Sequence, residues 1–379
     1  MPGKHPDMLP AMAVKPRIAI VGPGRLGRAL TLKLQRAGYV ISEIVSRDRV
    51  GSRQTARQLA RKVGAHASTG ESAHLDADVV WFCVPDREIA PVASQLASVV
   101  DWKRKTAFHS SGALASDELD LLRRRGAAVA SVHPLMTFVS GSIPPLKGVP
   151  FAVEGDAIAN RVARRIVRDL GGEAFTIRKQ HKAAYHAWGA FLSPLLLATL
   201  ATAEQVARAA GLSAVQARKK MLPIIRQTIA NYEALGPARA FSGPIVRGDA
   251  EIVRKHVQAL RKIPEARDVY LALARAALRH LPTRNRKELE KEIEQGLRRA
   301  LGAVEIGDRV RLTGIPPAVA GGKPETKALF KRCVGKVFPV AGFEKGLIEL
   351  EVGSVVGDFP AAHSIWIEPE FLERVEKPK

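Results

Sequence analysis

Apolar runs of strand length alternate with amphipathic stretches of helix length through the first half of the chain. The apolar runs predict strands at residues 17–21, 39–45, 79–84, 106–109, 128–132, 151–153 and 174–177. The stretches between them, such as 54–62 and 116–125, space their apolar residues as helices do. This alternation is typical of an α/β fold, in which helices cover both faces of a parallel sheet. We therefore predict a Rossmann-like domain over residues 15–178.

The pattern changes at about residue 179, where alanine and leucine become frequent and β-branched pairs become rare. Helices are expected at residues 182–210, 213–235, 250–260, 264–281 and 286–301. Together they predict an all-helical second domain over residues 179–301. Short apolar runs separated by Gly and Pro then predict strands at residues 309–312, 335–340, 347–352 and 364–367. Short strands at this spacing favour a small β-barrel over residues 302–379.

The composition is that of an ordinary globular protein. The 379 residues are 46% hydrophobic and 25% charged, which is enough chain for two or three domains. No apolar run approaches the roughly 20 residues needed to cross a bilayer, so we expect no membrane association. Residues 1–14 have no apolar stretch of the length that a secretory signal needs and are interpreted as a disordered leader. Cys83 and Cys333 lie far apart and indicate neither a disulfide framework nor a metal site, which favours a cytoplasmic protein.

The net charge of +22 is concentrated in the first 300 residues. Residues 301–379 carry 11 Lys and Arg against 11 Asp and Glu, so this last part is neutral. A positive field over a cleft attracts small anionic ligands. The basic residues are dispersed and aromatic residues make up only 5%, so the chain lacks the stacking surface typical of nucleic-acid binding, which we rate the weakest reading. Solvated basic helix faces are the simpler explanation of the charge.

Residues 18–27 have the order of a dinucleotide-binding turn: an apolar strand, a glycine turn and the start of a helix. Gly22 permits a tight turn, Gly24 lets the backbone approach a pyrophosphate, and Gly27 lets strand and helix pack closely. The intervening residues of the predicted cofactor site are Pro23, Arg25 and Leu26. The pyrophosphate would lie at a helix N-terminus, where free N–H groups and the helix dipole favour negative charge.

The residues after the second predicted strand bear on which nicotinamide cofactor is bound. A carboxylate there would bind the ribose hydroxyl of NAD, whereas a small polar residue followed by Arg suits the 2′-phosphate of NADP. Ser46 and Arg47 favour NADP. Two alternatives remain: Asp48 would bind the ribose hydroxyl of NAD, and Arg47 is also explained as an ordinary surface charge. Val84 and Pro85 end the next strand, where they would border the cofactor. The following Asp86 is best explained as a helix N-cap.

Two later segments place histidines and serines at adjacent strand ends. His109 and Ser110 end one strand, and His133 follows the next. Imidazoles titrate near neutral pH and exchange protons as a carbonyl or imine is reduced. The structural alternative is that Ser110 or Ser111 caps a turn and that His133 is a buried residue with its hydrogen bonds satisfied.

Three basic candidates lie in the predicted helical domain. Lys182 and His186 are four residues apart and therefore share one helix face, where a lysine would protonate a substrate atom. Arg247 lies in a Gly-Pro and Arg-Gly-Asp segment and would bind a carboxylate or phosphate with its fork of donors. The alternatives are an exposed Lys and a packed His on a hinge helix, and an Arg that pairs within its loop while Asp249 caps the next helix.

These motifs resemble DUF2520, a family similar to F420-dependent NADP oxidoreductases and, more distantly, to pyrroline-5-carboxylate reductase and the 6-phosphogluconate dehydrogenase superfamily. The resemblance covers residues 15–290 and rests on the segments 22–27, 84–86, 109–114, 131–135, 185–187 and 243–249. It implies NADP in the N-terminal crevice, a second domain like the C-terminal domain of 6-phosphogluconate dehydrogenase, and a homodimer formed through the helical domains.

Residues 182–194 also differ from the relatives. The catalytic Lys of the hydroxyacid dehydrogenases is followed four residues later by Asn, and here His186 takes that place after Lys182. Where the family commonly has Asn further along, this chain has Ser193 and Pro194. The segment from residue 302 lies outside the resemblance and looks like an SH3-like barrel.

The leading hypothesis is an NADP-dependent oxidoreductase that transfers hydride between the nicotinamide and a small anionic C=O or C=N substrate. His109 and Ser110 would lie near the nicotinamide, and Lys182 with His186 would exchange the proton with the substrate. His133 and Arg247 would contact the substrate. The alternative is a non-catalytic NADP sensor that relays occupancy to a partner through its C-terminal barrel.

Overall fold

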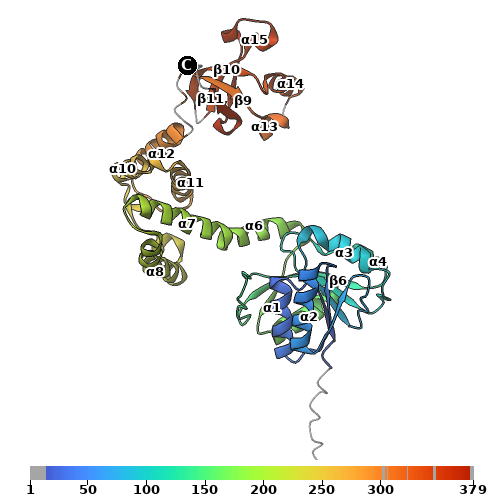
Figure 1. Cartoon of the computed structure of the whole chain (residues 1–379). Coiled ribbons are helices and arrows are strands. Elements are labelled where there is room, and N and C mark those ends of the chain that lie inside the picture. The colour runs from blue at the N-terminus through green and yellow to red at the C-terminus, as the bar shows by residue number, and fades with distance from the viewer. Residues whose placement is uncertain (1–13, 301–303, 305, 322, 345–346, 376–379) are drawn as a thin grey trace, which may run out of the picture. The chain divides into compact units, whose positions relative to one another are not determined.

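A computed structural model describes residues 14–300, 304, 306–321, 323–344 and 347–375 (Figure 1). All but the last residue of the predicted leader lie outside this range. The chain divides into two compact units, Met1–Leu196 and Leu197–Lys379. The division falls within helix α7 (Pro194–Ala209), so that α6 (Lys182–Leu192), with the candidate Lys182 and His186, belongs to the first unit.

The first unit is built on an eight-stranded sheet with the order β3-β2-β1-β4-β5-β6-β7-β8. Every neighbouring pair is parallel except β6 with β7, so the predicted parallel sheet is confirmed except at this one antiparallel pair. The strands are β1 (Ile18–Val21), β2 (Ile41–Ser46), β3 (His66–Thr69), β4 (Val79–Phe82), β5 (Thr106–His109), β6 (Ala128–Pro134), β7 (Pro150–Gly155) and β8 (Glu173–Thr176).

Helices cover both faces of this sheet, as the alternating pattern predicts (Figure 1). In β1, Ile18 and Ile20 pack with α1 (Arg25–Arg36), α2 (Val50–Val63) and α5 (Ala157–Asp169). Ala19 and Val21 point to the opposite face, toward α3 (Ile89–Leu96) and α4 (Asp120–Arg124). Because successive strand residues alternate between faces, a strand covered on both sides is apolar throughout. The central strands therefore read as continuous apolar runs.

Three local differences from the expected elements have physical causes. Strand β3 was not expected because it is short and half-exposed, with no apolar run. The expected helix at 116–125 is a 3-10 turn (Ser116–Leu119) followed by α4. The single helix expected at 182–210 is broken at Ser193, whose φ and ψ are −129° and −78°, because Pro194 cannot continue the helix and instead begins α7.

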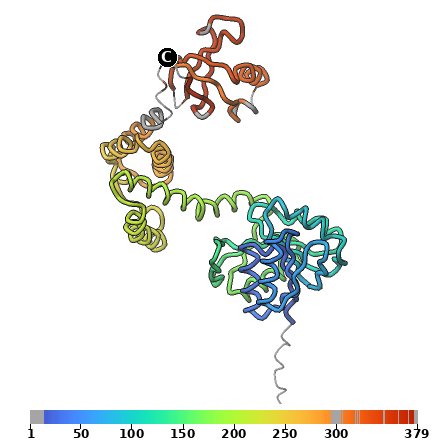
Figure 2. The backbone as a smooth tube through the Cα atoms, viewed as in Figure 1, coloured from blue at the N-terminus to red at the C-terminus, as the bar shows by residue number. Residues whose placement is uncertain are grey.

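The helices of the second unit are α7, α8 (Ala214–Ala240), α9 (Pro244–Arg247), α10 (Ala250–Ala259), α11 (Pro264–His280) and α12 (Arg286–Ala300). Their course can be followed in Figure 2. Helices α10, α11 and α12 share a core that includes Val253, Leu271 and Leu289. Helix α7 has no buried residue and α8 has only Ala217, so these two helices contribute little to a core within the chain.

The C-terminal part of the second unit forms an antiparallel sheet with the order β12-β11-β10-β9-β13. Its strands are β9 (Arg309–Leu312), β10 (Val337–Glu344), β11 (Leu347–Glu351), β12 (Ser364–Ile367) and β13 (Leu372–Arg374). Phe330 and Cys333 of α14 (Pro324–Cys333) pack into the core of this sheet. Over the described strands, no pairing joins β12 to β13, and the closed SH3-like barrel is not confirmed.

Candidate active site

The glycine turn after β1 has the geometry that its sequence predicts. Gly22 has a φ of +101°, and a Cβ there would lie 2.7 Å from the carbonyl oxygen of Cys83. A Cβ on Gly27 would lie 2.0 Å from the carbonyl oxygen of Gly22, so helix and turn touch at this point. Gly24 has no neighbour within 4 Å of that position and forms the N-cap of α1. The turn therefore leaves the first N–H groups of α1 accessible.

A cavity of about 620 Å³ lies over this turn, at the carboxyl edge of the sheet. Of the predicted cofactor residues, those that line it are Gly22, Pro23, Gly24, Ser46, Arg47, Val84 and Pro85. Arg25 and Leu26 begin α1 outside the lining, and Gly27 acts through packing. An open glycine, a helix N-terminus and the cationic side chain of Arg47 suit a dinucleotide diphosphate.

A smaller polar cavity of about 250 Å³ adjoins Ser46. It is lined by Asp48, Arg53, Arg57 and the hydroxyl residues Ser68, Thr69 and Ser72, among others. The carboxylate of Asp48 accepts a hydrogen bond of 2.5 Å from Arg53. Asp48 is thus neutralised by a cation and lines this smaller cavity, whereas Arg47 lines the larger one. This arrangement places positive rather than negative charge at the end of β2.

His109 is fully buried, and both of its ring nitrogens have partners. Its Nδ1 accepts from the backbone N–H of Ser111 at 3.1 Å, and its Nε2 lies 2.8 Å from the carbonyl oxygen of Ala115. These contacts fix a neutral ring that donates from Nε2. Burial lowers the pKa of His109 to about 4. The ring therefore holds the loop after β5 and has no nitrogen left for a substrate.

The serines after β5 join neighbouring strand ends. Ser110 accepts a hydrogen bond of 2.8 Å from the indole N–H of Trp81. Ser111 Oγ accepts from the backbone N–H groups of Ala113 and Leu114, so it caps a turn as the structural alternative states. The same hydroxyl donates to Asp86 at 2.9 Å. Asp86 makes no N-cap hydrogen bond, and the expected cap is wrong because its carboxylate binds Ser111 instead.

Lys182 lies at the first position of α6 and is 1% exposed. Its ammonium donates to the Ser131 hydroxyl at 2.6 Å and to the Ser111 carbonyl at 3.1 Å. Burial lowers the pKa of Lys182 to about 8, and the nearby carboxylates of Glu154 and Asp86 limit the fall. A buried ammonium with a pKa this close to neutrality is typical of a functional proton donor. The alternative of an exposed Lys on a hinge helix is therefore wrong for this residue.

His133 and His186 meet beside this lysine. Their ring centroids are 6.2 Å apart, and a Cβ on Gly112 would lie 2.9 Å from Nε2 of His133 and 2.7 Å from Cδ2 of His186. Nδ1 of His133 lies 2.8 Å from the hydroxyl of Tyr185. Burial lowers the pKa of His133 to about 4, and Lys182 and His186 add to this effect. Tyr185 was not among the predicted site residues, although its place three residues after Lys182 sets it on the same side of the helix.

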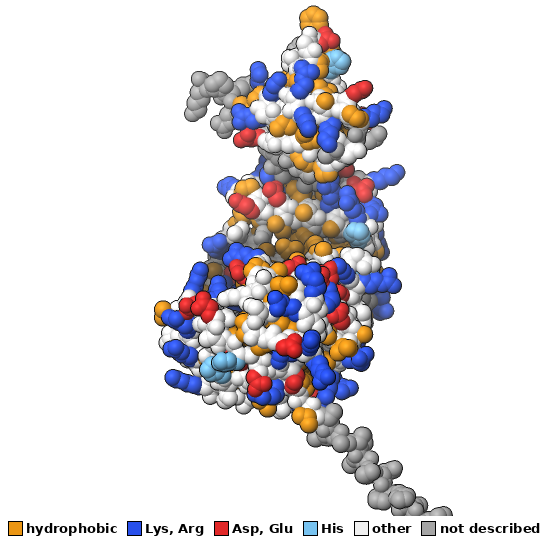
Figure 3. Space-filling view, turned by 90° about the vertical axis from the view of Figure 1, so that its right-hand side faces the viewer, with side chains coloured by type: hydrophobic (Ala, Val, Ile, Leu, Met, Phe, Trp, Pro, Cys, Tyr) orange, Lys and Arg blue, Asp and Glu red, His pale blue; other side chains and the backbone are white. Residues whose placement is uncertain are grey.

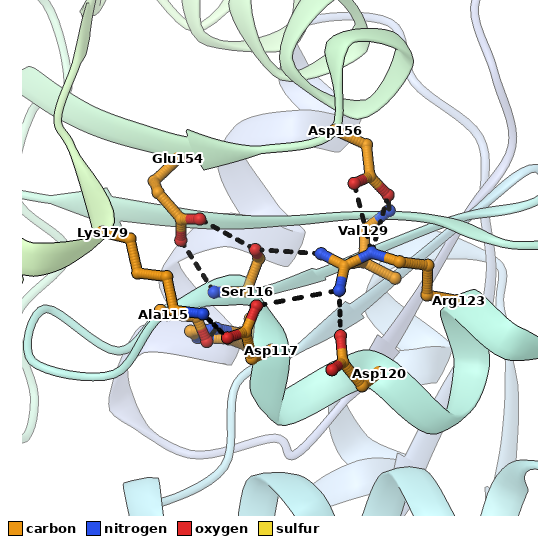
Figure 4. A network of polar contacts seen from close by, with 10 residues as sticks. Ala115, Ser116, Asp117, Asp120, Arg123, Val129, Glu154, Asp156 and Lys179 are labelled. Atoms are coloured by element: carbon orange, nitrogen blue, oxygen red, sulfur yellow. Dashed lines mark hydrogen bonds and ion pairs between the residues drawn. The ribbon is translucent and has the colours of Figure 1, made fainter.

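An ionic network supports the loop that follows His109 (Figure 4). Glu154 of β7 accepts from the Ser116 backbone N–H at 2.7 Å and from its hydroxyl at 2.9 Å. Arg123 contacts Asp156 at 3.2 Å. Lys179, just before α6, forms an ion pair with Asp117. The loop is thus tied both to the sheet and to the segment that leads into Lys182.

The second unit contains the predicted substrate residue Arg247. It is exposed at the end of α9, and its guanidinium forms no hydrogen bond or ion pair with the part of the chain that the structure describes. Gly248 has a φ of +76°, and a Cβ there would lie 2.5 Å from the carbonyl oxygen of Arg284. Asp249 caps α10 by accepting from the N–H of Ile252 at 3.3 Å. The cap predicted for Asp249 is therefore confirmed, and the guanidinium of Arg247 is accessible.

The surface shows two further features. Lys and Arg side chains are scattered among Asp and Glu on the visible face, without a continuous basic stripe (Figure 3). Within the described residues, the helical stretch Lys179–Ala209 is long and apolar enough to span a membrane by length and composition, and its most apolar window is unburied in the chain. The expectation that no run approaches this length overlooked this stretch, because Ser193 and Pro194 interrupt it.

Two protein families match parts of the chain. Residues 149–277 match DUF2520, a domain of unknown function. Residues 17–107 match the family described as NADP oxidoreductase, coenzyme F420-dependent. No curated protein matches. The resemblance based on the motifs is confirmed, and so is the prediction of an NADP-dependent oxidoreductase type.

Solved structures share the fold. An NADP oxidoreductase, so described, from Bacteroides fragilis is 21% identical, with a TM-score of 0.59 over 69% of this chain and 97% of its own. Protein TM1727 from Thermotoga maritima is 25% identical, with a TM-score of 0.55 over 73% and 99%. A reductive aminase from Aspergillus terreus, in complex with NADPH and ethyl-5-oxohexanoate, is 18% identical, with a TM-score of 0.52 over 73% and 99%.

Proposed function

We propose that this protein reduces a small C=O or C=N substrate that carries an anionic group, with NADPH as the hydride donor. The observation that carries the proposal is the buried ammonium of Lys182, linked to the nucleotide cavity by two hydrogen bonds. Lys182 binds the Ser111 carbonyl, and the Ser111 hydroxyl binds Asp86, which follows the cavity residue Pro85. When bound, NADPH supplies the hydride.

The residues of this chain would bind the cofactor and supply the proton. The turn at Gly22 and Gly24 would bind the diphosphate, and Ser46 with Arg47 would bind the 2′-phosphate. Lys182 would donate a proton to the substrate oxygen or nitrogen as hydride arrives at the adjacent carbon. Ser131 and Ser111 orient the ammonium for this step. Ser110 would border the nicotinamide, with its hydroxyl oriented by Trp81.

The binding of the substrate's anionic group by Arg247 stays a prediction. Its guanidinium is exposed at the end of α9, and the following Gly248 has a φ of +76°. A planar fork of donors binds a carboxylate through two hydrogen bonds. His186, exposed beside His133, would line the same substrate space as Lys182. A keto acid or a cyclic imino acid has both required groups.

We also propose that the protein is a homodimer formed through its helices. Large apolar side chains on α6 and α7 are exposed, including Trp188 at 50%, Phe191 at 69% and Leu197 at 67%. Such a surface is more apolar than that of a monomeric soluble protein and needs a partner. The charged residues 179, 182, 204 and 208 lie at the two ends of this apolar stretch, and we propose a second copy of the chain as the partner that covers it. Both cysteines are free, in agreement with a reducing cytoplasm.

The test combines binding with turnover. NADPH and NADH are titrated separately against the protein, and NADPH oxidation is then followed with a panel of keto acids and cyclic imines. We expect tighter binding of NADPH than of NADH, and turnover that Lys182→Met lowers about 100-fold. Lys182→Arg is the matched control, since it keeps a charge but not a titrating ammonium. Tight NADPH binding without turnover on any substrate would instead favour a cofactor sensor.

A further inference from the structure

The imidazole of His133 has two different environments at its two nitrogens. Nδ1 faces the hydroxyl of Tyr185 at 2.8 Å, and the two rings meet edge to face with centroids 5.5 Å apart. Nε2 faces the space kept open by Gly112 and has no hydrogen-bond partner among the described residues. One nitrogen is therefore engaged within the fold, whereas the other is available to a ligand.

The direction of the Tyr185 hydrogen bond follows from burial. The side chain of Tyr185 is 6% exposed, and Nδ1 of His133 is the hydrogen-bond partner found for its hydroxyl in the described structure. A buried phenol that lacks an acceptor for its proton loses a hydrogen bond, which is costly. Donation from Tyr185 to Nδ1 avoids this loss and requires a lone pair on Nδ1. The single ring proton of a neutral His133 then lies on Nε2.

The free Nε2 lies on the same side of the sheet as the Lys182 ammonium. His133 and Ser131 are two residues apart on β6, so their side chains project from one face of the strand. Ser131 is the hydroxyl that binds Lys182. A Cβ at position 112 would lie 2.9 Å from Nε2, so only a glycine leaves room there for another atom. The geometry thus brings one ammonium and one imidazole N–H to a common space.

We propose that Tyr185 is a positioning residue that fixes His133 as the Nε2–H tautomer, and that His133 donates this hydrogen bond to the substrate oxygen or nitrogen that Lys182 protonates. This inference rests on the proposed function. In the reduction, the C=O or C=N carbon gains a hydride from NADPH, and its heteroatom gains the proton of Lys182. Lys182 becomes neutral and regains a proton from solvent. His133 keeps its proton throughout and stabilises the developing charge.

The neutral state of His133 makes this division of roles possible. Burial keeps the pKa of its imidazolium far below neutrality, and the nearby Lys182 lowers it further. An imidazolium beside the ammonium would have no carboxylate bound to it, and its Nδ1 would not accept from Tyr185. A neutral ring is a hydrogen-bond donor that does not compete with Lys182 as the acid.

The first measurement needs no substrate. In protein labelled with nitrogen-15 in its histidines, we expect the His133 ring to show an unprotonated Nδ1 and a protonated Nε2 at pH 7. Tyr185→Phe keeps the aromatic ring but removes the hydroxyl, so the signals should shift toward a mixture of tautomers. A resting His133 protonated on Nδ1 would overturn the proposal, whether or not the protein proves to be a reductase.

The second measurement uses turnover. Tyr185→Phe should lower kcat about tenfold while KM and NADPH affinity change little, because one hydrogen bond in the transition state weakens. His133→Gln, which retains an N–H donor, should keep more activity than His133→Ala. Unchanged kcat in Tyr185→Phe, or equal losses in the two His133 variants, would contradict the inference.

The chain supplies a matched control for the tyrosine change. His256 and Tyr270 in the second unit have rings 5.8 Å apart and a contact of 3.1 Å between Nδ1 and the hydroxyl. Tyr270→Phe makes the same chemical change in a similar pair away from Lys182 in the chain. Turnover should stay at the level of the unmodified protein, so that a loss shared by both variants would reveal a general effect of removing a tyrosine hydroxyl and would count against the proposal.

Discussion

At the scale of single residues, the role of a side chain in the site depends on its hydrogen-bond partners rather than on its chemical type. His109 and His133 are both buried imidazoles with lowered pKa values. The two nitrogens of His109 bind the backbone, whereas His133 has one nitrogen free. Of these two histidines, only His133 therefore has a ring nitrogen available to a substrate. The same comparison separates Lys182, which is held by two acceptors, from the many solvated lysines of the chain.

Substitution of the glycines in the nucleotide turn should affect stability and NADPH affinity differently from one position to the next. Gly24→Ala adds a methyl group to open space at an ordinary φ of −68°, so the melting temperature should hardly change. NADPH affinity should still fall at least tenfold, because that methyl group occupies the space where the diphosphate approaches. Binding titration and thermal unfolding measure the two effects.

Gly27→Ala is the matched control for that change. Its Cβ would lie 2.0 Å from the carbonyl oxygen of Gly22, so the variant should lose both stability and affinity. If Gly24→Ala bound NADPH as tightly as the unmodified protein, the diphosphate would not lie over this turn.

Activity should depend on pH through Lys182. Its pKa of about 8 means that the ammonium is present at pH 7 and is lost as the pH rises through 8. The kcat/KM of reduction should therefore fall on the alkaline side with an apparent pKa of about 8. The profile of Lys182→Arg should lack this alkaline limb. A limb that persists in Lys182→Arg would assign the titration to another group.

Stability should follow the opposite trend in the same range. The pKa of Lys182 lies below its ordinary value of 10.5, so the unfolded chain binds more protons between pH 8 and 10.5. This residue therefore contributes a stability term that rises with pH over that interval. Denaturant unfolding of the native protein and of Lys182→Met across this range isolates the term.

At the scale of elements, the loop after β5 is held from two sides. Glu154 of β7 binds the backbone and the hydroxyl of Ser116, and Lys179 before α6 pairs with Asp117 (Figure 4). The strand end, the loop and the start of the helix that contains Lys182 are thereby joined. Antiparallel pairing of β6 with β7 places Glu154 opposite Ser131, the residue that binds Lys182.

Glu154→Gln tests this coupling. The amide has one acceptor oxygen where the carboxylate uses two, so we expect a loss of about 1–2 kcal/mol in the free energy of unfolding. The change also removes a negative charge that favours the Lys182 ammonium, so the alkaline limb of activity should move to lower pH. Hydrogen exchange at the Ser116 amide should become faster. An unshifted pH profile would show that Glu154 acts on the loop alone.

At the scale of the whole molecule, the exposed apolar side chains of α6 and α7 favour a dimer. We expect light scattering to find a dimer and expect Phe191→Glu or Leu197→Glu to weaken it, because a buried carboxylate without a partner is costly. Ile158→Glu is the control, since Ile158 is 57% exposed and belongs to a different helix, α5. A native protein that stays monomeric at micromolar concentration would refute the proposed dimer.

The chain by itself determined the α/β architecture, the nucleotide turn and the helical segments. These features depend on apolar runs, glycine spacing and helical periodicity. Each of these patterns is formed by residues that are close together in the sequence. The same signals located Lys182 four residues before His186. They did not distinguish β7 from a parallel strand, because an apolar run buried on both faces reads the same in either direction.

The tertiary structure alone decided which polar groups meet. The contact of Lys182 with Ser131 joins residues 51 positions apart, and that of His133 with Tyr185 joins residues 52 positions apart. It also showed that His109 is satisfied by its own loop and that Asp86 binds Ser111 instead of capping a helix. Protonation and hydrogen bonding depend on burial and on partners brought together by the fold, which no local pattern specifies.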